Sequence, residues 1–476
     1  MKKHINNKIL LLVLTFAFAV MLSGSAAAAS PDNSTNITIQ TVTHTTSTIQ
    51  PVSTSIKSSI AKSTSITLPD PYNTRTGIHY STIQGAINSA YTKNGDTIDV
   101  TPGTYPENVV VSKKLNLLST THLGATVYSF LINPTGSGST ISGFNIIKDN
   151  TKYAPAGIFV MEANNIHIQN NKIQYGIFEV SPIRTSISGN TIKHGIYLDA
   201  PTSVHIVSNT LCSSENGIEV DSAGYTIIED NNIENNNNAG INVEDSSNTL
   251  IVNNLITDNG VNGLWVNNVN YLTIINNNII NNGQDGINLS NGLCMDQDPI
   301  NNIISQNNIN SNEYGIELSG WLSGNTIQFN RITNNLDYGL VDSGSCSVNA
   351  EYNWWGNNNA ANVLAEIHNT GSGSVTYGPW IVLSISANPS KILVYGTSTI
   401  TADLLHDSNG AYHNPVNGEV PYTGSANFQS SKGTINNSNF SNGTAKTTTT
   451  YESLFEEATI YSTVDNQTVS TNITVI

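Results

Sequence analysis

The chain has 476 residues, which is enough for two or three domains. It carries 18 lysines and arginines against 34 aspartates and glutamates, a formal net charge of −16. No stretch forms a basic patch, which argues against a nucleic-acid partner. Charged residues are only 11% of the sequence, and the apolar periodicity described below argues against disorder throughout the chain.

The first 69 residues have the pattern of an export signal followed by a linker. Residues 1–29 contain a basic start with three lysines, an apolar segment from Ile9 to Leu22, and small residues up to Ala29, as in a signal peptide. A retained N-terminal anchor is the alternative, and no other stretch is apolar enough to cross a bilayer. Residues 30–69 are rich in serine and threonine, which is typical of a flexible linker. We therefore expect a protein that is secreted or held at the cell surface.

The cysteines favour free thiols. Cys212, Cys294 and Cys346 are an odd number, so at most one disulfide can form within the chain. Because small apolar side chains suit a stacked core, we expect these thiols to be buried.

The central part of the chain, from residue 157 to about residue 357, is an internal repeat. Each unit begins with a Gly-Ile-x-Val-like tetrad, in which the first and third residues after the glycine are apolar and the second is free. This alternation is the period of a β-strand. The copy at Gly176, which ends in Glu179, is weaker than the others. The glycines lie 19 to 29 residues apart, at Gly157, Gly176, Gly195, Gly217, Gly240, Gly263, Gly286 and Gly315.

A second motif, Ile-x-x-Asn-x-Ile, follows each tetrad. Asparagine tolerates the left-handed backbone conformation that a sharp turn needs. Its amide can also bond the amides above and below, so we expect a ladder of asparagines. The pattern selects Asn171, Asn190, Asn209, Asn231, Asn254, Asn278 (between Ile275 and Ile280), Asn307 and Asn330.

The repeat length favours a parallel β-helix. A unit of about 20 residues is too short for two helices and a turn, but it suits a coil of short strands. One coil cannot bury its own isoleucines, whereas coils stacked at about 4.8 Å place isoleucine over isoleucine in one apolar column. No 3.6-residue period supports a helical solenoid, and no blade-length period supports a propeller.

A helix is predicted just before the first strands, from Tyr80 to Tyr91. Its apolar residues recur on one face, and Ser81 with Gln84 forms a capping-box pattern. A β-helix has an open apolar end with exposed strand edges. We therefore expect this helix to cap the N-terminal end of the β-helix.

Several motifs support this architecture by resemblance. The segment 80–118 resembles the start of pectin-lyase-like right-handed β-helix proteins through Thr82-Ile83-Gln84, Gly95-Asp96-Thr97-Ile98 and Pro102-Gly103-Thr104-Tyr105. The repeats resemble NosD-type parallel β-helix repeats. Adhesin-like surface proteins of methanogenic archaea have a similar closing segment, matched here by Asn353-Trp354-Trp355-Gly356 and Tyr377-Gly378-Pro379-Trp380. The resemblance covers about residues 75–382, and we expect a right-handed parallel β-helix over residues 70–382. It implies no single activity, because this architecture hosts lyases, hydrolases and non-enzymes.

Residues 383–476 differ from the repeat and predict a β-sandwich. Short alternating strands rich in threonine, such as Ser398–Leu405 and Ala458–Val464, are separated by turn signals. Asn388-Pro389 and Gly433-Thr434-Ile435 make this part similar to the Ig-like repeats of bacterial invasin-type adhesins. That resemblance implies a stalk or spacer.

Two groups of side chains are candidate binding sites on the expected outer surface. The second residue after each glycine faces outward, and in three consecutive units it is Phe159, Phe178 and Tyr197. Such a stripe is a candidate for stacking on sugar rings, with coverage by a loop as the alternative.

The second candidate is acidic. In adjacent units the fourth residue after the glycine is Asp199, Asp221 or Glu244, with Asp245 beside it. These four are a candidate site for Ca²⁺, which prefers oxygen ligands; a solvated acidic edge is the alternative. A smaller acidic group is Asp285 with Asp296 and Asp298.

An enzyme of this architecture needs more than acids. A lyase needs a basic residue beside the acids to abstract a proton, yet the only arginines, Arg75, Arg184 and Arg331, lie outside the acidic units. We therefore favour a non-catalytic surface protein that contacts a polysaccharide or another cell surface and requires no cofactor. The alternatives are a calcium-dependent polysaccharide lyase or glycosidase, and a structural component of the envelope.

Overall fold

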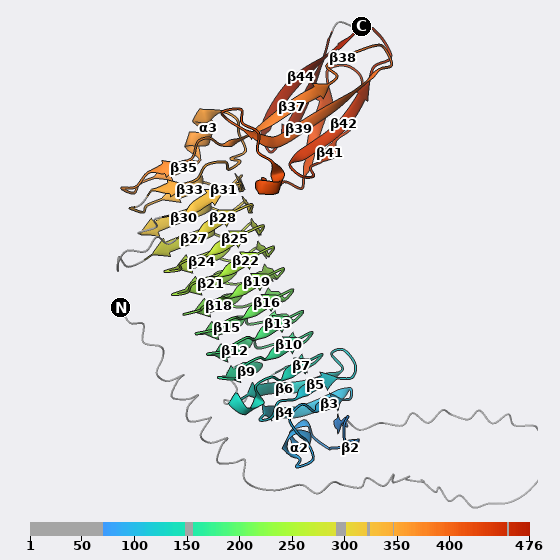
Figure 1. The fold of residues 1–476 in the computed structure, drawn as a ribbon, viewed down its shortest axis with the longest axis vertical. Coiled ribbons are helices and arrows are strands. Elements are labelled where there is room, and N and C mark those ends of the chain that lie inside the picture. Colours follow the sequence, from blue (N-terminus) through green and yellow to red (C-terminus); the bar gives the residue numbers. More distant parts are fainter. Residues whose placement is uncertain (1–69, 148–155, 292–300, 321–323, 346, 455–456) are drawn as a thin grey trace, which may run out of the picture.

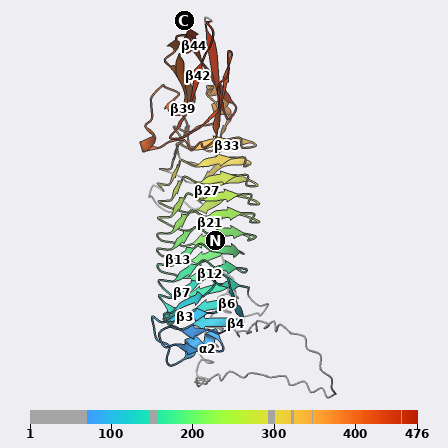
Figure 2. The same ribbon diagram turned by 90° about the vertical axis from the view of Figure 1, so that its right-hand side faces the viewer.

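The computed structural model describes residues 70–147, 156–291, 301–320, 324–345, 347–454 and 457–476. They form a long stack of short parallel strands followed by a smaller unit of two sheets (Figures 1 and 2). The two α-helices in this part of the chain, α2 (Ile83–Asn88) and α3 (Ala360–Ala365), have six residues each. The predicted signal peptide and linker lie outside the described residues. No helix in the described ranges is long and apolar enough to cross a membrane.

Each coil of the stack contributes one strand to each of three columns. The first column is a sheet of its own, and β1 (Tyr72–Asn73) and β2 (Ile78–His79) extend it in antiparallel fashion. Its parallel strands are β3 (Thr97–Val100), β5 (Asn116–Ser119), β7 (Thr140–Ser142), β10 (His167–Gln169), β13 (Ser186–Ser188), β16 (His205–Val207), β19 (Ile227–Glu229), β22 (Leu250–Val252), β25 (Thr273–Ile275), β28 (Ile303–Ser305), β31 (Thr326–Gln328), β34 (Val348–Asn349) and β36 (Val375–Thr376).

The second and third columns share the other large sheet, which β4 (Gly103–Val111) and β6 (Ala125–Ile132) begin. The second column continues with β8 (Asn145–Ile146), β11 (Lys172–Ile173), β14 (Thr191–Lys193), β17 (Thr210–Cys212), β20 (Asn232–Glu234), β23 (Leu255–Thr257), β26 (Asn278–Ile280), β29 (Asn308–Asn310) and β32 (Arg331–Thr333). The third continues with β9 (Ile158–Met161), β12 (Ile177–Val180), β15 (Ile196–Asp199), β18 (Ile218–Asp221), β21 (Ile241–Glu244), β24 (Leu264–Asn267), β27 (Asp285–Asn291), β30 (Tyr314–Gly320), β33 (Tyr338–Asp342) and β35 (Ile367–Asn369).

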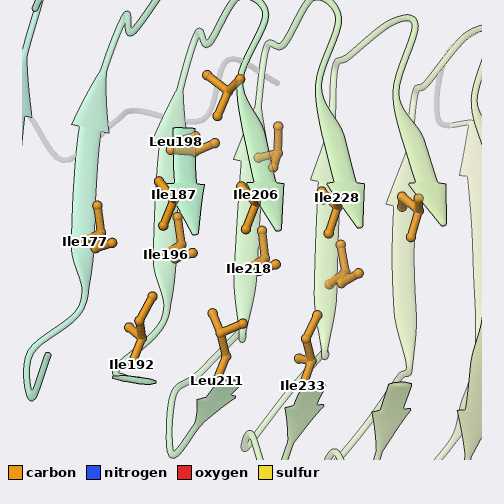
Figure 3. Close-up of a cluster of buried hydrophobic side chains, with 14 of the residues drawn as sticks. Ile177, Ile187, Ile192, Ile196, Leu198, Ile206, Leu211, Ile218, Ile228 and Ile233 are labelled. Carbon is orange, nitrogen blue, oxygen red and sulfur yellow. The ribbon is translucent and has the colours of Figure 1, made fainter. Parts of the chain in front are cut away.

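The core confirms the predicted parallel β-helix. In the first column Ile187 pairs with Ile168 on one side and with Ile206 on the other, and all three are fully buried. Figure 3 shows the same stacking in all three columns, with the isoleucines and leucines of successive coils in rows from left to right. Because every coil adds to one continuous apolar core, each coil stabilises its neighbours.

The asparagine ladder is also confirmed, with two corrections. Its side-chain amides donate to the next amide oxygen at 3.0 to 3.1 Å. The member after Asn254 is Asn277 and not the predicted Asn278, whose side chain is exposed. The left-handed conformation belongs to the residue before each ladder asparagine, for example Asn253 at φ 57°. The ladder comprises Asn171, Asn190, Asn209, Asn231, Asn254, Asn277, Asn307, Asn330 and Asn353.

A second ladder explains the glycine of the tetrads from Gly217 to Gly315. Asn236, Asn259 and Asn282 donate to the next member at 2.9 to 3.0 Å. A Cβ on Gly240 would lie 2.8 Å from Asn259 Nδ2 and 2.8 Å from the carbonyl oxygen of Gly263. The glycine therefore provides room for the ladder, since these distances are shorter than real Cβ contacts.

Helix α2 lies at the N-terminal end of the stack (Figure 1). Its residues Ile83, Ala86 and Ile87 are fully buried and belong to the same core as the coils. The helix is shorter than predicted, and its N-cap is Thr82 rather than Ser81, since Thr82 Oγ1 accepts from the amide of Gly85 at 2.9 Å. β-Branched Thr82 satisfies one of the free amides of the first turn, as an N-cap does.

The C-terminal unit consists of two sheets around a shared apolar core. One sheet contains β37 (Ile381–Asn388), β39 (Thr397–Asp407) and β42 (Thr444–Thr450). The other contains β38 (Lys391–Ile392), β44 (Gln467–Val475), β43 (Ala458–Val464), β40 (Ser425–Ser430) and β41 (Ser438–Asn439). Trp354 of the closing coil is buried in this second core.

Cys212, predicted to be buried, is a free and half-buried thiol, because its position in β17 faces outward. Cys294 and Cys346 lie outside the described residues.

Candidate functional site

One line of side chains runs along the outer surface of the third column, and we call it the outward column. Strand alternation places it there, because the residues on either side, such as Ile218 and Val220 around Glu219, are buried. Consecutive members are direct partners in the parallel sheet. They are Phe159, Phe178, Tyr197, Glu219, Asn242, Trp265, Asn288 and Glu317.

The three aromatic residues predicted to stack on sugars form one group in which neighbouring rings contact one another. The rings of Phe178 and Tyr197 are 4.8 Å apart at an angle of 3°, and Phe159 lies 5.4 Å from Phe178. Phe159 is only 4% exposed. This ring stacking stabilises neighbouring coils, and contact of the group with a sugar ring stays a prediction.

Trp265 is the aromatic side chain of the outward column that the sequence analysis did not single out. It is half-buried, and its partners in the sheet are Asn242 and Asn288. No aromatic ring among the described residues stacks on it. Further along the column on either side of Trp265, Glu219 is the next partner of Asn242 and Glu317 is the next partner of Asn288. The order is therefore Glu-Asn-Trp-Asn-Glu, symmetrical about the tryptophan.

The predicted acidic column has the expected register, because Asp199, Asp221 and Glu244 are direct partners. Burial, and then Asp221, raises the pKa of Asp199. Burial together with four surrounding carboxylates raises the pKa of Tyr197 to about 12. Asp245 lies in the turn and accepts from the Asn268 amide at 2.5 Å. Across the described ranges no three acidic, histidine or cysteine side chains are grouped so that they could hold a metal ion, so the calcium prediction has no ligand geometry to support it.

A carboxylate pair lies at the other end of the outward column. Asn288 Nδ2 donates to Asp285 at 2.7 Å and to Glu317 at 2.8 Å. Asp285 is 3% exposed. Burial and the adjacent Glu317 raise the pKa of Asp285 to about 7, although the bond from Asn288 opposes this shift. Asp285 is therefore partly protonated near neutral pH. Of the small acidic group predicted here, Asp296 and Asp298 lie outside the described residues.

The arginines are placed away from these acids. Arg75 forms an ion pair with Asp96 at 2.5 Å, and Arg331 pairs with Asp465 of the C-terminal unit. Arg184 is exposed in a turn at φ 57°. None of the three reaches the outward column from Glu219 to Glu317, so the basic residue that a lyase needs is not supplied by arginine.

The comparisons agree with this architecture. Residues 175–323 match a family model described as a right handed beta helix region. No curated protein matches the sequence. Solved structures with a similar fold include the A-module of the Azotobacter vinelandii mannuronan C-5 epimerase AlgE6, at 17% identity and a TM-score of 0.46 over 62% of this chain and 93% of that one. The catalytic domain of a GH87 α-1,3-glucanase is similar at 13% identity and a TM-score of 0.41, over 62% and 66%.

Residues 175–323 are a right-handed β-helix region. The Dettilon tailspike protein is a further structure with this fold, at 12% identity and a TM-score of 0.35 over 78% of this chain and 84% of that one. These likenesses, with TM-scores below 0.5, carry no conclusion about function. The resemblance to archaeal adhesin-like proteins and the non-catalytic role stay predictions.

Proposed function

We propose that this protein is exported and binds a polysaccharide along the outward column, with Trp265 at the centre of the site. The observation that carries the proposal is the symmetrical order from Glu219 to Glu317 around an indole on which no other ring stacks. An indole packs against the apolar face of a sugar ring. Amides and carboxylates on both sides can accept and donate hydrogen bonds with its hydroxyl groups.

The remaining parts of the chain fit a rigid display of this site. We propose that α2 caps the N-terminal end of the stack and that the C-terminal unit is an Ig-like spacer at the cell surface. Trp354 supports a fixed junction, because its Nε1 donates to Asp465 in the C-terminal unit at 2.6 Å.

The test measures binding of the full chain to a panel of soluble polysaccharides and oligosaccharides. Trp265→Ala should weaken binding of the best ligand by at least about tenfold, since loss of a central aromatic contact costs roughly 2 kcal/mol. Tyr225→Ala is the matched control, because Tyr225 is an aromatic residue that is 64% exposed at a turn beside the first column. Equal loss in both variants, or no binding to any glycan, would contradict the proposal.

A second candidate function is cleavage of the bound glycan, and the Asp285–Glu317 pair favours it. A carboxyl group that keeps its proton near neutral pH can act as a general acid. However, Asp285 is only 3% exposed, and a general acid must reach the oxygen that it protonates. Binding therefore remains the preferred function.

Release of reducing ends from the best ligand tests this second function. Asp285→Asn should abolish the release and leave binding within about twofold, whereas Glu229→Gln on the first column should change neither. Undiminished release in Asp285→Asn would exclude Asp285 as the acid.

A further inference from the structure

The region around Trp265 is strongly and uniformly acidic. From residue 194 to residue 330 the sequence contains fifteen aspartates and glutamates and no lysine or arginine. Coils in this stretch include those from β15 to β30. Five of the carboxylates occupy outer positions of the third column, namely Asp199, Glu219, Asp221, Glu244 and Glu317.

The nearest fixed cations do not neutralise these acids. Lys193 ends β14, one coil before Glu219, and Arg331 is already paired with Asp465. At the level of Glu244, the neighbouring second column presents a further acid, Glu234, on β20. A polyuronate chain laid along the outward column would therefore meet like charges with no counter-charge, which is unfavourable.

The carboxylates along the column offer acceptors alone. Ionised carboxylates only accept. Asn242 lies between Glu219 and Trp265, is 2% exposed, and its Oδ1 has no hydrogen-bond partner. Burial, and then the carboxylates of Glu244, Glu215 and Asp221, raise the pKa of Glu219, while the bond from Asn216 at 3.0 Å opposes the shift. A ligand that fits this column must bring donors and positive charge.

We propose that the ligand of the outward column is a cationic glycan, a polymer of amino sugars with free ammonium groups. This inference rests on the proposed function. Each ammonium group supplies three donors and one positive charge, which matches Glu219, Asn242 and Glu244 on one side of Trp265. Sugar rings between the ammonium groups contact the indole. The repeat of the acids from coil to coil suits a repeating polymer.

The experiment compares three probes of equal length on the full chain: a glucosamine oligomer, its fully N-acetylated form and a galacturonate oligomer. The glucosamine oligomer should bind at least about tenfold more tightly than either, and binding should weaken as salt screens the charges. The double variant Glu219→Gln/Glu244→Gln should lose at least about tenfold. Glu229→Gln is the control for charge, because Glu229 lies on the outer surface of the first column.

The outcomes separate the two proposals. If the N-acetylated or galacturonate oligomer binds best and Trp265→Ala still weakens it, the charge inference is wrong and the proposed function stands. If none of the probes binds, and no glycan of the larger panel does, both are wrong. If an oligolysine of equal charge binds as tightly as the glucosamine oligomer, with no effect of Trp265→Ala, the site recognises charge alone and the sugar assignment is overturned.

Discussion

Arg331 in the second column of the β-helix forms a buried ion pair with Asp465, in the turn between β43 and β44. The side chains are 11% and 5% exposed. Arg331 Nη1 also donates to Asn308 at 2.6 Å, and its guanidinium lies 5.3 Å from the ring centroid of Tyr422. The pair therefore connects the last coils with the C-terminal unit.

Removing one partner of this pair should destabilise the junction. Asp465→Ala leaves Arg331 buried without its counter-charge, which typically costs about 3–5 kcal/mol. We expect the C-terminal unit to become sensitive to protease while the coils keep their protection. Arg331→Met combined with Asp465→Leu should be less destabilised than Asp465→Ala, since neither charge remains. Equal loss in both variants would show that the ion pair is not what holds the junction.

Glu179 should make stability depend on pH. It replaces the usual apolar residue of the tetrad, faces inward between Val160 and Leu198, is fully buried, and neither of its carboxylate oxygens has a hydrogen-bond partner. Burial raises the pKa of Glu179 to about 8 from an ordinary 4.5, while Thr185 opposes the shift. The folded state therefore keeps a proton that the unfolded state loses above pH 4.5.

The sign follows from this difference in bound protons. The loss of folding stability caused by Glu179 is absent below pH 4.5. It grows as pH rises from about 4.5 to about 8, and then stays constant. At roughly 1.4 kcal/mol per pH unit, it reaches on the order of 5 kcal/mol. Thermal unfolding of the wild type and of Glu179→Gln across pH 5 to 9 tests this. The difference in Tm should widen with pH up to about 8, and parallel curves would contradict it.

The asparagine ladder gives a matched pair of variants. Asn277 is 1% exposed; its side chain donates to the carbonyl of Ile251 and to the amide of Asn307, and it accepts from Asn254. Asn277→Ala leaves several of these buried groups without partners, so we expect a loss of about 3 kcal/mol or more. Asn278→Ala, one residue later and exposed, should change stability by less than about 0.5 kcal/mol. Denaturant unfolding of both variants measures this difference. An equal loss of free energy of unfolding in the two variants would contradict the stabilising role of the ladder.

The repeat made the core predictable from sequence. Strand alternation fixed which side of each tetrad is buried, so the isoleucine columns followed directly from the spacing of the glycines. The ladder was displaced by one residue at Asn277 because that unit contains Ile274 and Ile275 followed by three asparagines, so two registers fit the pattern equally well. Only pairing with Asn254 and Asn307 distinguishes them.

The candidate site was harder to predict. Sequence spacing placed Phe178 and Tyr197 on the outside, but the orientation of their rings depends on stacking at 4.8 Å between coils. The same rule of alternation placed Trp265 in the outward column. Its neighbours there are the amides of Asn242 and Asn288, so its environment differs from that of the stacked rings of Phe178 and Tyr197. The pairing of Asp285 with Glu317 depends on residues 32 positions apart, and it became visible only when the coils were stacked.

Oxidative footprinting of the full chain with and without the glucosamine oligomer tests the central claim most directly. The ligand should protect Trp265 from oxidation. It should leave unchanged the oxidation of Tyr225 and Tyr271, which are 64% and 52% exposed beside the first column. Protection of Tyr225 and Tyr271 with Trp265 unchanged would place the ligand on the other sheet and contradict the account.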